Sequence, residues 1–214
     1  MNFFKSLFNR EEEKSPPRQL EHPKDLQIND IIKFGFTAQS GISNETFKVK
    51  AIKTYDLGGD SKKKTVFTLE GSQAIFDLAV VDERGQEFLE LSQSVLPDTV
   101  EKVFDIQQFA RLFDSDSGVN HVLERTGEPD HVNGWTTTLY RQETGHQAYL
   151  HTGDYRERVL SRLADGSEEF DYYLLVSDDR QFSIQIEVFD GGRTEVKLTV
   201  YLPISKIEEL WPSK

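Results

Sequence analysis

Alternation of apolar and polar residues is clearest near the end of the chain. In FSIQIEVFDGGRTEVKLTVYLPI (182–204), apolar side chains occupy every second position on both sides of Asp190–Arg193. A period of two is typical of a half-buried strand, and consecutive glycines supply the positive φ of a tight turn. The pattern predicts a β-hairpin whose buried face holds Ile184, Ile186, Val188, Val196, Leu198 and Val200. On the opposite face we expect the solubilising side chains Glu187, Glu195 and Lys197.

Shorter runs of the same kind recur along the chain, separated by Gly, Pro and Asp turns. Residues 74–92 carry two apolar runs around Asp82–Gly85, which predicts a second hairpin, with a helix over 86–92 as the alternative. Between 119 and 150 the runs are short and predict several small strands. Further strands are predicted at 25–35, 46–55, 65–71 and 170–179.

Two segments have helical spacing instead. In VFDIQQFARLFD (103–114) apolar residues recur at three- and four-residue steps, which predicts a helix. SKIEELWP (205–212) predicts a short terminal helix with Ser205 as N-cap and Glu208 at the capping-box position. The sum is a mainly β fold of the α+β class. We expect antiparallel sheets, or a partly open barrel or sandwich, with one or two short helices.

The first ten residues, MNFFKSLFNR, form an amphipathic pattern. On a helix Phe3, Phe4, Leu7 and Phe8 share a face, and the opposite face carries Lys5 and Arg10. Pro16–Pro17 must end any such helix. Two interpretations stay open: the segment packs on its own domain or frays, or it docks on a membrane or a partner protein.

Differences in composition along the chain predict three regions. We expect an amphipathic N-terminal segment with a Pro-rich tether at 1–24, a first β-rich half ending in a helix at 25–113, and a second β-rich half ending in a short helix at 114–214. The body is acidic, because the 214 residues carry a net charge of −12. An acidic body disfavours nucleic acid as a partner, and the basic run 62–64 is interpreted as a solvated turn.

Candidate chemistry is sparse. The chain has no cysteine, which excludes disulfides and thiolate catalysis, and it contains no nucleotide-binding or metalloprotease motif. Histidine and carboxylate side chains can bind metals, so the weak metal candidates are His121, His131, His146 and His151. Their spacings of ten, fifteen and five residues are not those of ligands on one face of a strand or helix. We expect loop and strand-edge histidines and no cofactor.

The chain has a family resemblance that rests on four stretches: MNFFKSLFNR, VKAIKTYDLGGDS, FDYYLLVSD and IEVFDGGRTEVKLTVYLPISKIEELWP. It resembles uncharacterised bacterial β-rich proteins, some of them encoded beside membrane-stress proteins similar to phage-shock protein A. The resemblance implies an accessory role near the inner membrane and offers no catalytic residues to carry over.

Three functions follow as hypotheses. The first is a non-enzymatic accessory or adaptor protein, cytoplasmic and peripheral to the inner membrane, that binds a protein partner. It docks through Phe3, Phe4, Lys5, Leu7, Phe8 and Arg10. The second is a metal-dependent hydrolase that uses the His121–His151 region. The third is a small-ligand-binding β-barrel, and the oligomeric state is left open.

Overall fold

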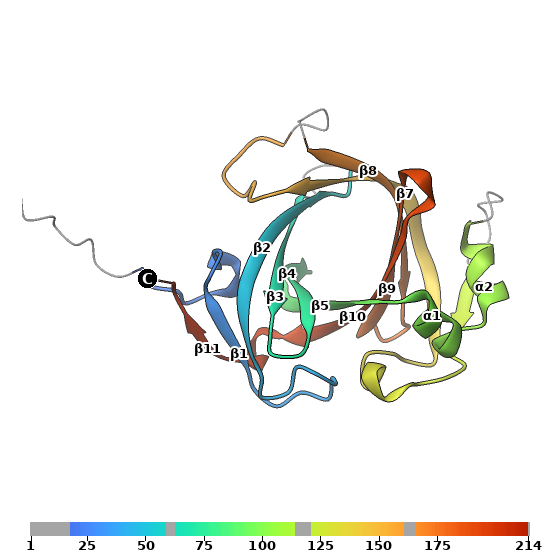
Figure 1. Ribbon diagram of the computed structural model, residues 1–214, viewed down its shortest axis with the longest axis horizontal. Helices are drawn as coiled ribbons and strands as arrows, with labels where there is room; N and C mark the ends of the chain where they lie inside the picture. The colour runs from blue at the N-terminus through green and yellow to red at the C-terminus, as the bar shows by residue number, and fades with distance from the viewer. Residues whose placement is uncertain (1–17, 59–62, 114–120, 161–165, 214) are drawn as a thin grey trace, which may run out of the picture.

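The fold is one large antiparallel sheet with two short helices (Figure 1). The structure is a computed structural model, and it describes residues 18–58, 63–113, 121–160 and 166–213. The order of the eleven strands is β11-β1-β2-β3-β4-β5-β10-β9-β8-β7-β6. The mainly β prediction with one or two short helices is therefore confirmed.

The strand bounds follow the alternating runs closely in most places. The strands are β1 (Ile31–Phe34), β2 (Thr46–Asp56), β3 (Lys63–Glu70), β4 (Ile75–Glu83), β5 (Gln86–Val95), β6 (Val122–Glu124), β7 (Leu139–Thr152), β8 (Ser167–Val176), β9 (Phe182–Phe189), β10 (Thr194–Pro203) and β11 (Ile207–Trp211). Both predicted hairpins are present, as β4–β5 and β9–β10. The small strands expected after 134 are instead one strand, β7, which is fourteen residues long.

An additional pairing between β2 and β7 closes eight of the strands into a ring. Around the ring the order is β2, β3, β4, β5, β10, β9, β8 and β7, while β1 and β11 extend from β2 and β6 extends from β7. Figure 1 shows the ring, with β1 and β11 to one side and the helices on the other. Strands β1 to β5 from 25–113 are neighbours in this sheet, strands β6 to β10 from 114–214 are neighbours, and only β11 crosses over to pair with β1.

Two short α-helices follow β5. Helix α1 (Pro97–Val103) begins at a proline, and α2 (Ile106–Ala110) is capped by Asp105, whose carboxylate accepts hydrogen bonds from Gln107 N and Gln108 N. The helix predicted over 103–114 is shorter, because Phe104 and Asp105 are extended and the 3-10 turn η2 (Arg111–Phe113) follows α2.

The terminal helix predicted over 205–212 is wrong. The segment forms the 3-10 turn η5 (Ile204–Lys206) and then strand β11, which pairs with β1. Backbone hydrogen bonds to β1 stabilise strand β11. The predicted helix rested on Ser205 and Glu208 as capping residues, and this local pattern cannot indicate that β1 is available for pairing.

The strands bury side chains on both of their faces. The larger hydrophobic cluster begins at Leu20 and covers the outside of the ring wall, where Trp135 stacks on Phe76 at 5.1 Å. The smaller cluster lies inside the ring around Tyr55, Phe170, Tyr172 and other residues. Because only the smaller apolar cluster lies inside the ring, polar side chains can occupy the rest of the interior.

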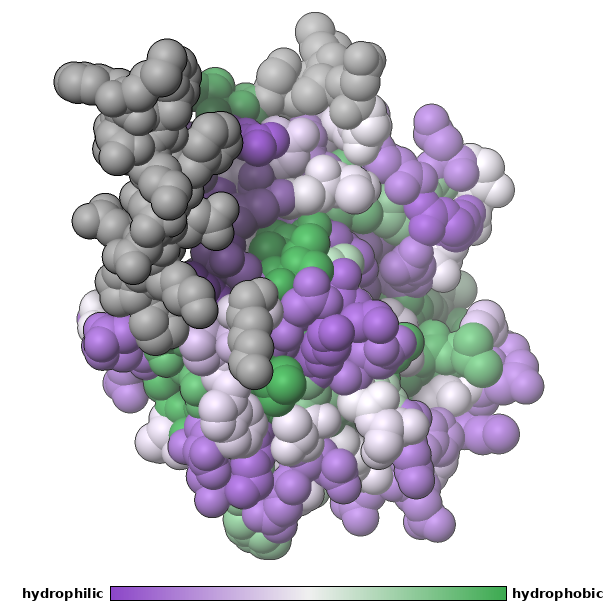
Figure 2. Space-filling view, turned by 60° about the vertical axis from the view of Figure 1, so that its left-hand side comes forward, coloured by the Kyte–Doolittle hydropathy of each residue, from purple (hydrophilic) through white to green (hydrophobic). Residues whose placement is uncertain are grey.

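The remaining 3-10 turns connect these layers; they are η1 (Pro23–Asp25), η3 (Asp130–Val132) and η4 (Asp190–Gly192). The face seen in the space-filling view is mostly hydrophilic, with one hydrophobic area near its centre and smaller ones toward its edges (Figure 2). No helix among the described residues is long and apolar enough to cross a membrane.

Candidate functional site

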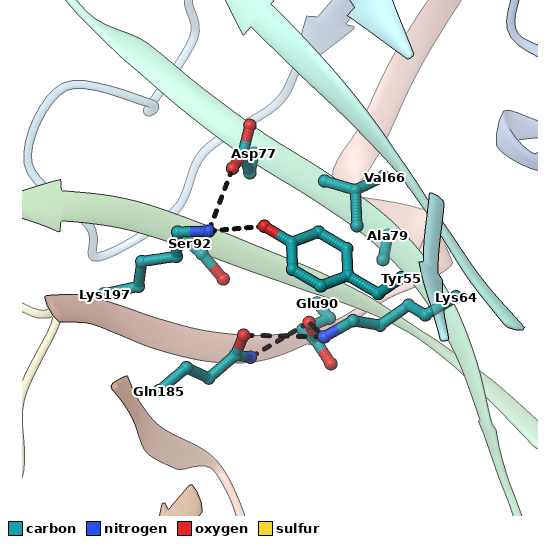
Figure 3. A pocket seen from close by; sticks show the side chains of 9 residues that line it. All are labelled: Tyr55, Lys64, Val66, Asp77, Ala79, Glu90, Ser92, Gln185 and Lys197. Carbon is teal, nitrogen blue, oxygen red and sulfur yellow. Dashed lines mark hydrogen bonds and ion pairs between the residues drawn. The ribbon is translucent and has the colours of Figure 1, made fainter. Parts of the chain in front are cut away.

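The inside of the ring holds a buried cluster of charged side chains. Lys197 on β10 lies 2.7 Å from Glu187 on β9, and its Nζ donates to the hydroxyl of Tyr55 on β2 at 2.8 Å. Tyr55 in turn donates to Glu187 at 3.4 Å. Strands β2 and β10 are on opposite sides of the ring, so these contacts cross its interior (Figure 3).

A second group lies beside the first. Lys64 Nζ on β3 is 2.7 Å from Glu90 on β5, and Gln185 Nε2 on β9 donates to the same carboxylate at 3.0 Å. Both lysine ammonium groups face the Tyr55 ring, at 5.5 Å and 5.2 Å from its centroid. A cation near a buried aromatic face is stabilised by the ring quadrupole.

Charges in this cluster balance. Asp77 on β4 completes the set, 3.7 Å from both Lys197 and Lys53, and accepts a hydrogen bond from Thr68 at 2.9 Å. Three lysines therefore face three carboxylates. Burial opposes the charge on Lys197, but Glu187, Tyr55 and Asp77 outweigh it and raise the pKa of the ammonium group. The ammonium group of Lys197 therefore stays ionised at neutral pH.

Little free space is left among these side chains. The cavity that they line leaves about 10 Å³ for the centre of a water molecule, which is room for about one water. The ring interior here is filled by its own side chains. The arrangement links several strands, because Tyr55 on β2 bonds to Lys197 and Glu187 across the interior and Lys197 also lies near Asp77 on β4.

Two expectations from the sequence are corrected here. Glu187 and Lys197 do not keep an outer face soluble; they are 1% and 4% exposed inside the ring. Within the basic run 62–64, Lys64 is not a solvated turn residue but lies on β3 and pairs with Glu90. In both cases ring closure buries a face that alternation alone assigns to solvent.

At one end of the ring the cluster opens into a recess of about 800 Å³. Lys64 and Glu90 form its inner end, and His146 on β7 and Tyr172 on β8 line its side. His146 Nδ1 bonds to Thr144 Oγ1 at 2.8 Å, while its enclosed Nε2 has no hydrogen-bond partner among the described residues. Burial raises the pKa of Tyr172, so its hydroxyl remains protonated. These groups could donate hydrogen bonds to a small polar molecule.

A second depression, of about 570 Å³, shares Lys64 with the recess and is called the basic groove below. Its apolar floor consists of Leu57, Phe67, Val80 and Val81. Its rim carries the cations Lys24, Lys63, Lys64 and Arg156 and the carboxylate of Asp82. Arg156 stacks over the Phe67 ring at 5.4 Å and donates to Leu26 O at 2.9 Å. The cations already have partners: three pair with Glu87, Glu90 and Asp154, and Lys63 donates to two backbone carbonyl oxygens.

One wall of the basic groove includes Lys24, which lies near the start of the described residues. Arg18 Nη1 donates to Asp25 O at 2.9 Å, and Arg18 also forms an ion pair with the fully buried Asp30. Asp30 further accepts from Gln27 N at 2.7 Å and from Ser213 N at 2.8 Å. Burial disfavours the ionised carboxylate, but these donors together lower the pKa of Asp30. Both ends of the described chain are thereby fixed at one point.

The four histidines suggested as metal ligands differ in position and in hydrogen-bond partner. His131 bonds to Thr99, and His121 precedes β6. His146 and His151 are both on β7, but an odd spacing of five places them on opposite faces of the strand. Across the described ranges, no three His, Cys, Asp or Glu residues are grouped so that they could hold a metal ion.

The predicted docking residues, Phe3 to Arg10, lie outside the described residues. Sequence reasoning missed the buried cluster, although Lys, Glu and Gln at alternate positions of β9 and β10 are a signal for it. The basic groove carries no sequence signal, because its side chains come from segments far apart in the chain. In comparisons with protein-family models, curated proteins and solved structures, nothing matches the chain.

Proposed function

We propose that this protein is a non-enzymatic adaptor of the cytoplasmic face of the inner membrane. In this proposal residues 1–17 attach it to the membrane surface and the β body binds a protein partner. The observation that supports it most directly is the pattern of MNFFKSLFNR, which places Phe3, Phe4, Leu7 and Phe8 on one face of a helix.

The chemistry of the segment fits a membrane surface. Phe3, Phe4, Leu7 and Phe8 could each contribute roughly 1.5–3 kcal/mol when fully buried. Lys5 and Arg10 would each add about 1 kcal/mol beside anionic lipids. The three glutamates at 11–13 oppose this attraction, so the attachment is reversible.

The body fits a scaffold better than an acid–base catalyst. Its buried acids and bases pair with one another, and the enclosed cavity beside Glu187 and Lys197 leaves room for about one water. A general acid or base must instead reach a substrate.

Co-sedimentation with anionic vesicles of phosphatidylglycerol and phosphatidylethanolamine tests the attachment. The full chain should bind, and a variant with serine at positions 3, 4, 7 and 8 should bind at least about tenfold more weakly, the equivalent of 1.4 kcal/mol. The matched control is Phe36→Ser with Val159→Ser, which removes two apolar side chains that are 75% and 94% exposed on the body. Equal binding by all three proteins, or binding by none, would reject membrane attachment. If the full chain does not bind vesicles but captures a protein partner that the serine variant fails to capture, the segment docks on that partner instead.

A small-ligand site at the ring end is a second candidate, favoured by Nε2 of His146 in the recess, which has no partner within the described part of the chain. Native mass spectrometry of the purified full chain tests it. A co-purifying small molecule that disappears in Tyr172→Phe with His146→Phe would support the site. The same spectrum for both proteins would reject it.

A further inference from the structure

A pocket of about 500 Å³, called the loop pocket below, lies between the loop that joins β1 to β2 and the residues at and after η3. Figure 1 shows both segments at the lower edge of the molecule. Its lining includes Phe36, Thr37, Gln39 and Glu45 from the first loop and Asp130 and Asn133 from the second. None of its described lining residues belongs to the recess or to the basic groove, so it is a separate site.

Hydrogen bonds hold the two sides of the loop pocket together. Gln39 Nε2 donates to Gly134 O at 2.9 Å, and Ser40 N donates to Asn133 O at 3.1 Å. Trp135 Nε1 donates to Ser40 O at 3.0 Å. These contacts position the lining side chains before any ligand arrives, which lowers the entropic cost of binding.

Two buried oxygen atoms of the loop pocket lack a partner. Thr37 and Gln39 are 4% and 7% exposed, and Thr37 Oγ1 and Gln39 Oε1 have no hydrogen-bond partner among the described residues. Because Gln39 Nε2 is bonded to Gly134 O, the amide cannot turn over without losing that bond. Buried polar atoms are nearly always satisfied by protein, water or ligand. Both oxygens can accept a hydrogen bond from a donor in the pocket.

The charge of this lining is negative. Its described residues include the carboxylates of Glu45 and Asp130 but no Lys, Arg or His. Neither carboxylate forms an ion pair within the described part of the chain, and the neighbouring Lys206 donates instead to Phe36 O at 2.9 Å. The Phe36 side chain is 75% exposed. Charge and an accessible aromatic ring therefore both favour a cationic ligand.

We propose that the loop pocket binds an arginine side chain of the protein partner. A guanidinium group has five N–H donors in one plane, so it can donate to Gln39 Oε1 and Thr37 Oγ1 and also pair with a carboxylate. Its flat face can stack on Phe36. A metal ion fits less well, because no three His, Cys, Asp or Glu of the described chain are grouped to hold one. That the arginine belongs to a partner rests on the proposed adaptor function, whereas the chemistry of the pocket does not.

An NMR titration of the full chain with arginine blocked at both ends as amides tests the pocket. The chain has 2 tryptophans, so the indole N–H signal of Trp135 is readily assigned. Blocked arginine should shift this signal saturably, because the indole is bonded to Ser40 O in the pocket loop. Blocked citrulline has the same shape without the charge and should bind at least about threefold more weakly. Equal binding of the two compounds, or a Trp135 signal that moves with calcium chloride and not with blocked arginine, would overturn the inference.

Thr37→Val tests the buried hydroxyl. It removes Oγ1 and keeps the backbone bond from Thr37 N to Ser43 Oγ. Because the hydroxyl has no partner in the free protein, the variant should unfold at the same temperature or higher and still bind blocked arginine about threefold more weakly. Undiminished binding by a folded Thr37→Val protein would count against the proposed site.

A pair of double variants tests the charge. Glu45→Gln with Asp130→Asn should weaken the binding of blocked arginine roughly three- to tenfold. The matched control is Glu157→Gln with Asp171→Asn, which changes two exposed acids elsewhere by the same charge and should leave binding unaltered. If both double variants bind like the original protein, the carboxylates play no part and the inference fails.

Failure of the proposed function gives a different result. Free arginine has an α-carboxylate that Glu45 and Asp130 repel, so tighter binding of free than of blocked arginine would reject a protein partner as its source. Binding of blocked arginine by a protein that does not sediment with vesicles supports the loop pocket and rejects membrane attachment. A protein that sediments with vesicles but does not respond to blocked arginine keeps its membrane attachment and loses the proposed pocket.

Discussion

Lys197 is the most strongly coupled residue of the ring interior, because Glu187, Asp77 and Tyr55 all contact its ammonium group. Removing one partner of a buried ion pair leaves the other unpaired in a medium of low polarity. We predict that Lys197→Met lowers the free energy of unfolding by roughly 3–5 kcal/mol, measured by denaturant titration.

The matched double variant isolates the cause. Adding Glu187→Leu to Lys197→Met removes the stranded carboxylate, while Asp77 keeps Lys53 and Thr68 as partners. The double variant should therefore be more stable than the single one. A single variant as stable as the original protein would mean that water reaches the cluster freely.

His151 introduces a dependence on pH. It is 1% exposed, and its two ring nitrogens have no hydrogen-bond partner among the described residues. Burial lowers its pKa, an effect that Asp56 partly offsets. In the unfolded chain the ring takes up a proton near pH 6.5, but the folded protein resists protonation to lower pH.

Because the unfolded state binds more protons in that window, the contribution of neutral His151 to stability is complete above about pH 6.5 and falls as the pH is lowered toward its folded pKa. The slope is at most about 1.4 kcal/mol per pH unit. Denaturant titrations between pH 7 and 5 should show this loss, and His151→Leu should flatten it. An unchanged slope in His151→Leu would contradict the prediction.

At the scale of the element, two glycines with the same φ of +77° allow a matched comparison. A Cβ at Gly134 would lie 2.4 Å from Ala38 O, whereas nothing lies within 4 Å of one at Gly191 in the β9–β10 turn. We predict that Gly191→Ala costs about 1–2 kcal/mol from backbone conformation alone. Gly134→Ala should cost clearly more, because it also displaces the loop that carries Trp135. Equal losses in thermal unfolding would show that this loop adjusts freely.

Prediction from sequence succeeded where local pattern determines the element. The β9–β10 hairpin followed from alternation and from Gly191–Gly192, and its register pairs Val196 with Ile186, two residues of the predicted apolar face. Strand β11 was missed because its conformation depends on pairing with β1, about 175 residues earlier, and not on its own helical spacing. The single strand β7 was missed because polar residues interrupt its apolar pattern.

The candidate site was less predictable than the fold. Alternation assigned Glu187 and Lys197 to one face correctly, but only the β2–β7 pairing makes that face an interior. The basic groove joins residues from η1, β3, β4 and the loop after β7, and no local pattern links those segments. Such a site becomes visible only when the topology is known.

For the whole molecule, the weakest part of the ring is the β2–β7 pairing. It joins four residue pairs, Lys53↔Thr152 to Asp56↔Tyr149, whereas β7–β8 joins ten. A sheet opens locally most easily where the fewest contacts hold two strands together. We predict that backbone amides at 53–56 and 149–152 exchange hydrogen before those of β9 and β10, as measured by mass spectrometry. Uniform protection around the ring would contradict this.

The position of β10 between β5 and β9 has a consequence for biosynthesis. The ribosome releases β5 well before β10, and at 5–20 residues per second the interval is roughly 5 to 20 seconds. During that time the nascent polypeptide presents an open strand edge, which invites incorrect pairing with neighbouring chains. Productive maturation in the cell is therefore expected to depend on chaperone protection until translation passes residue 203.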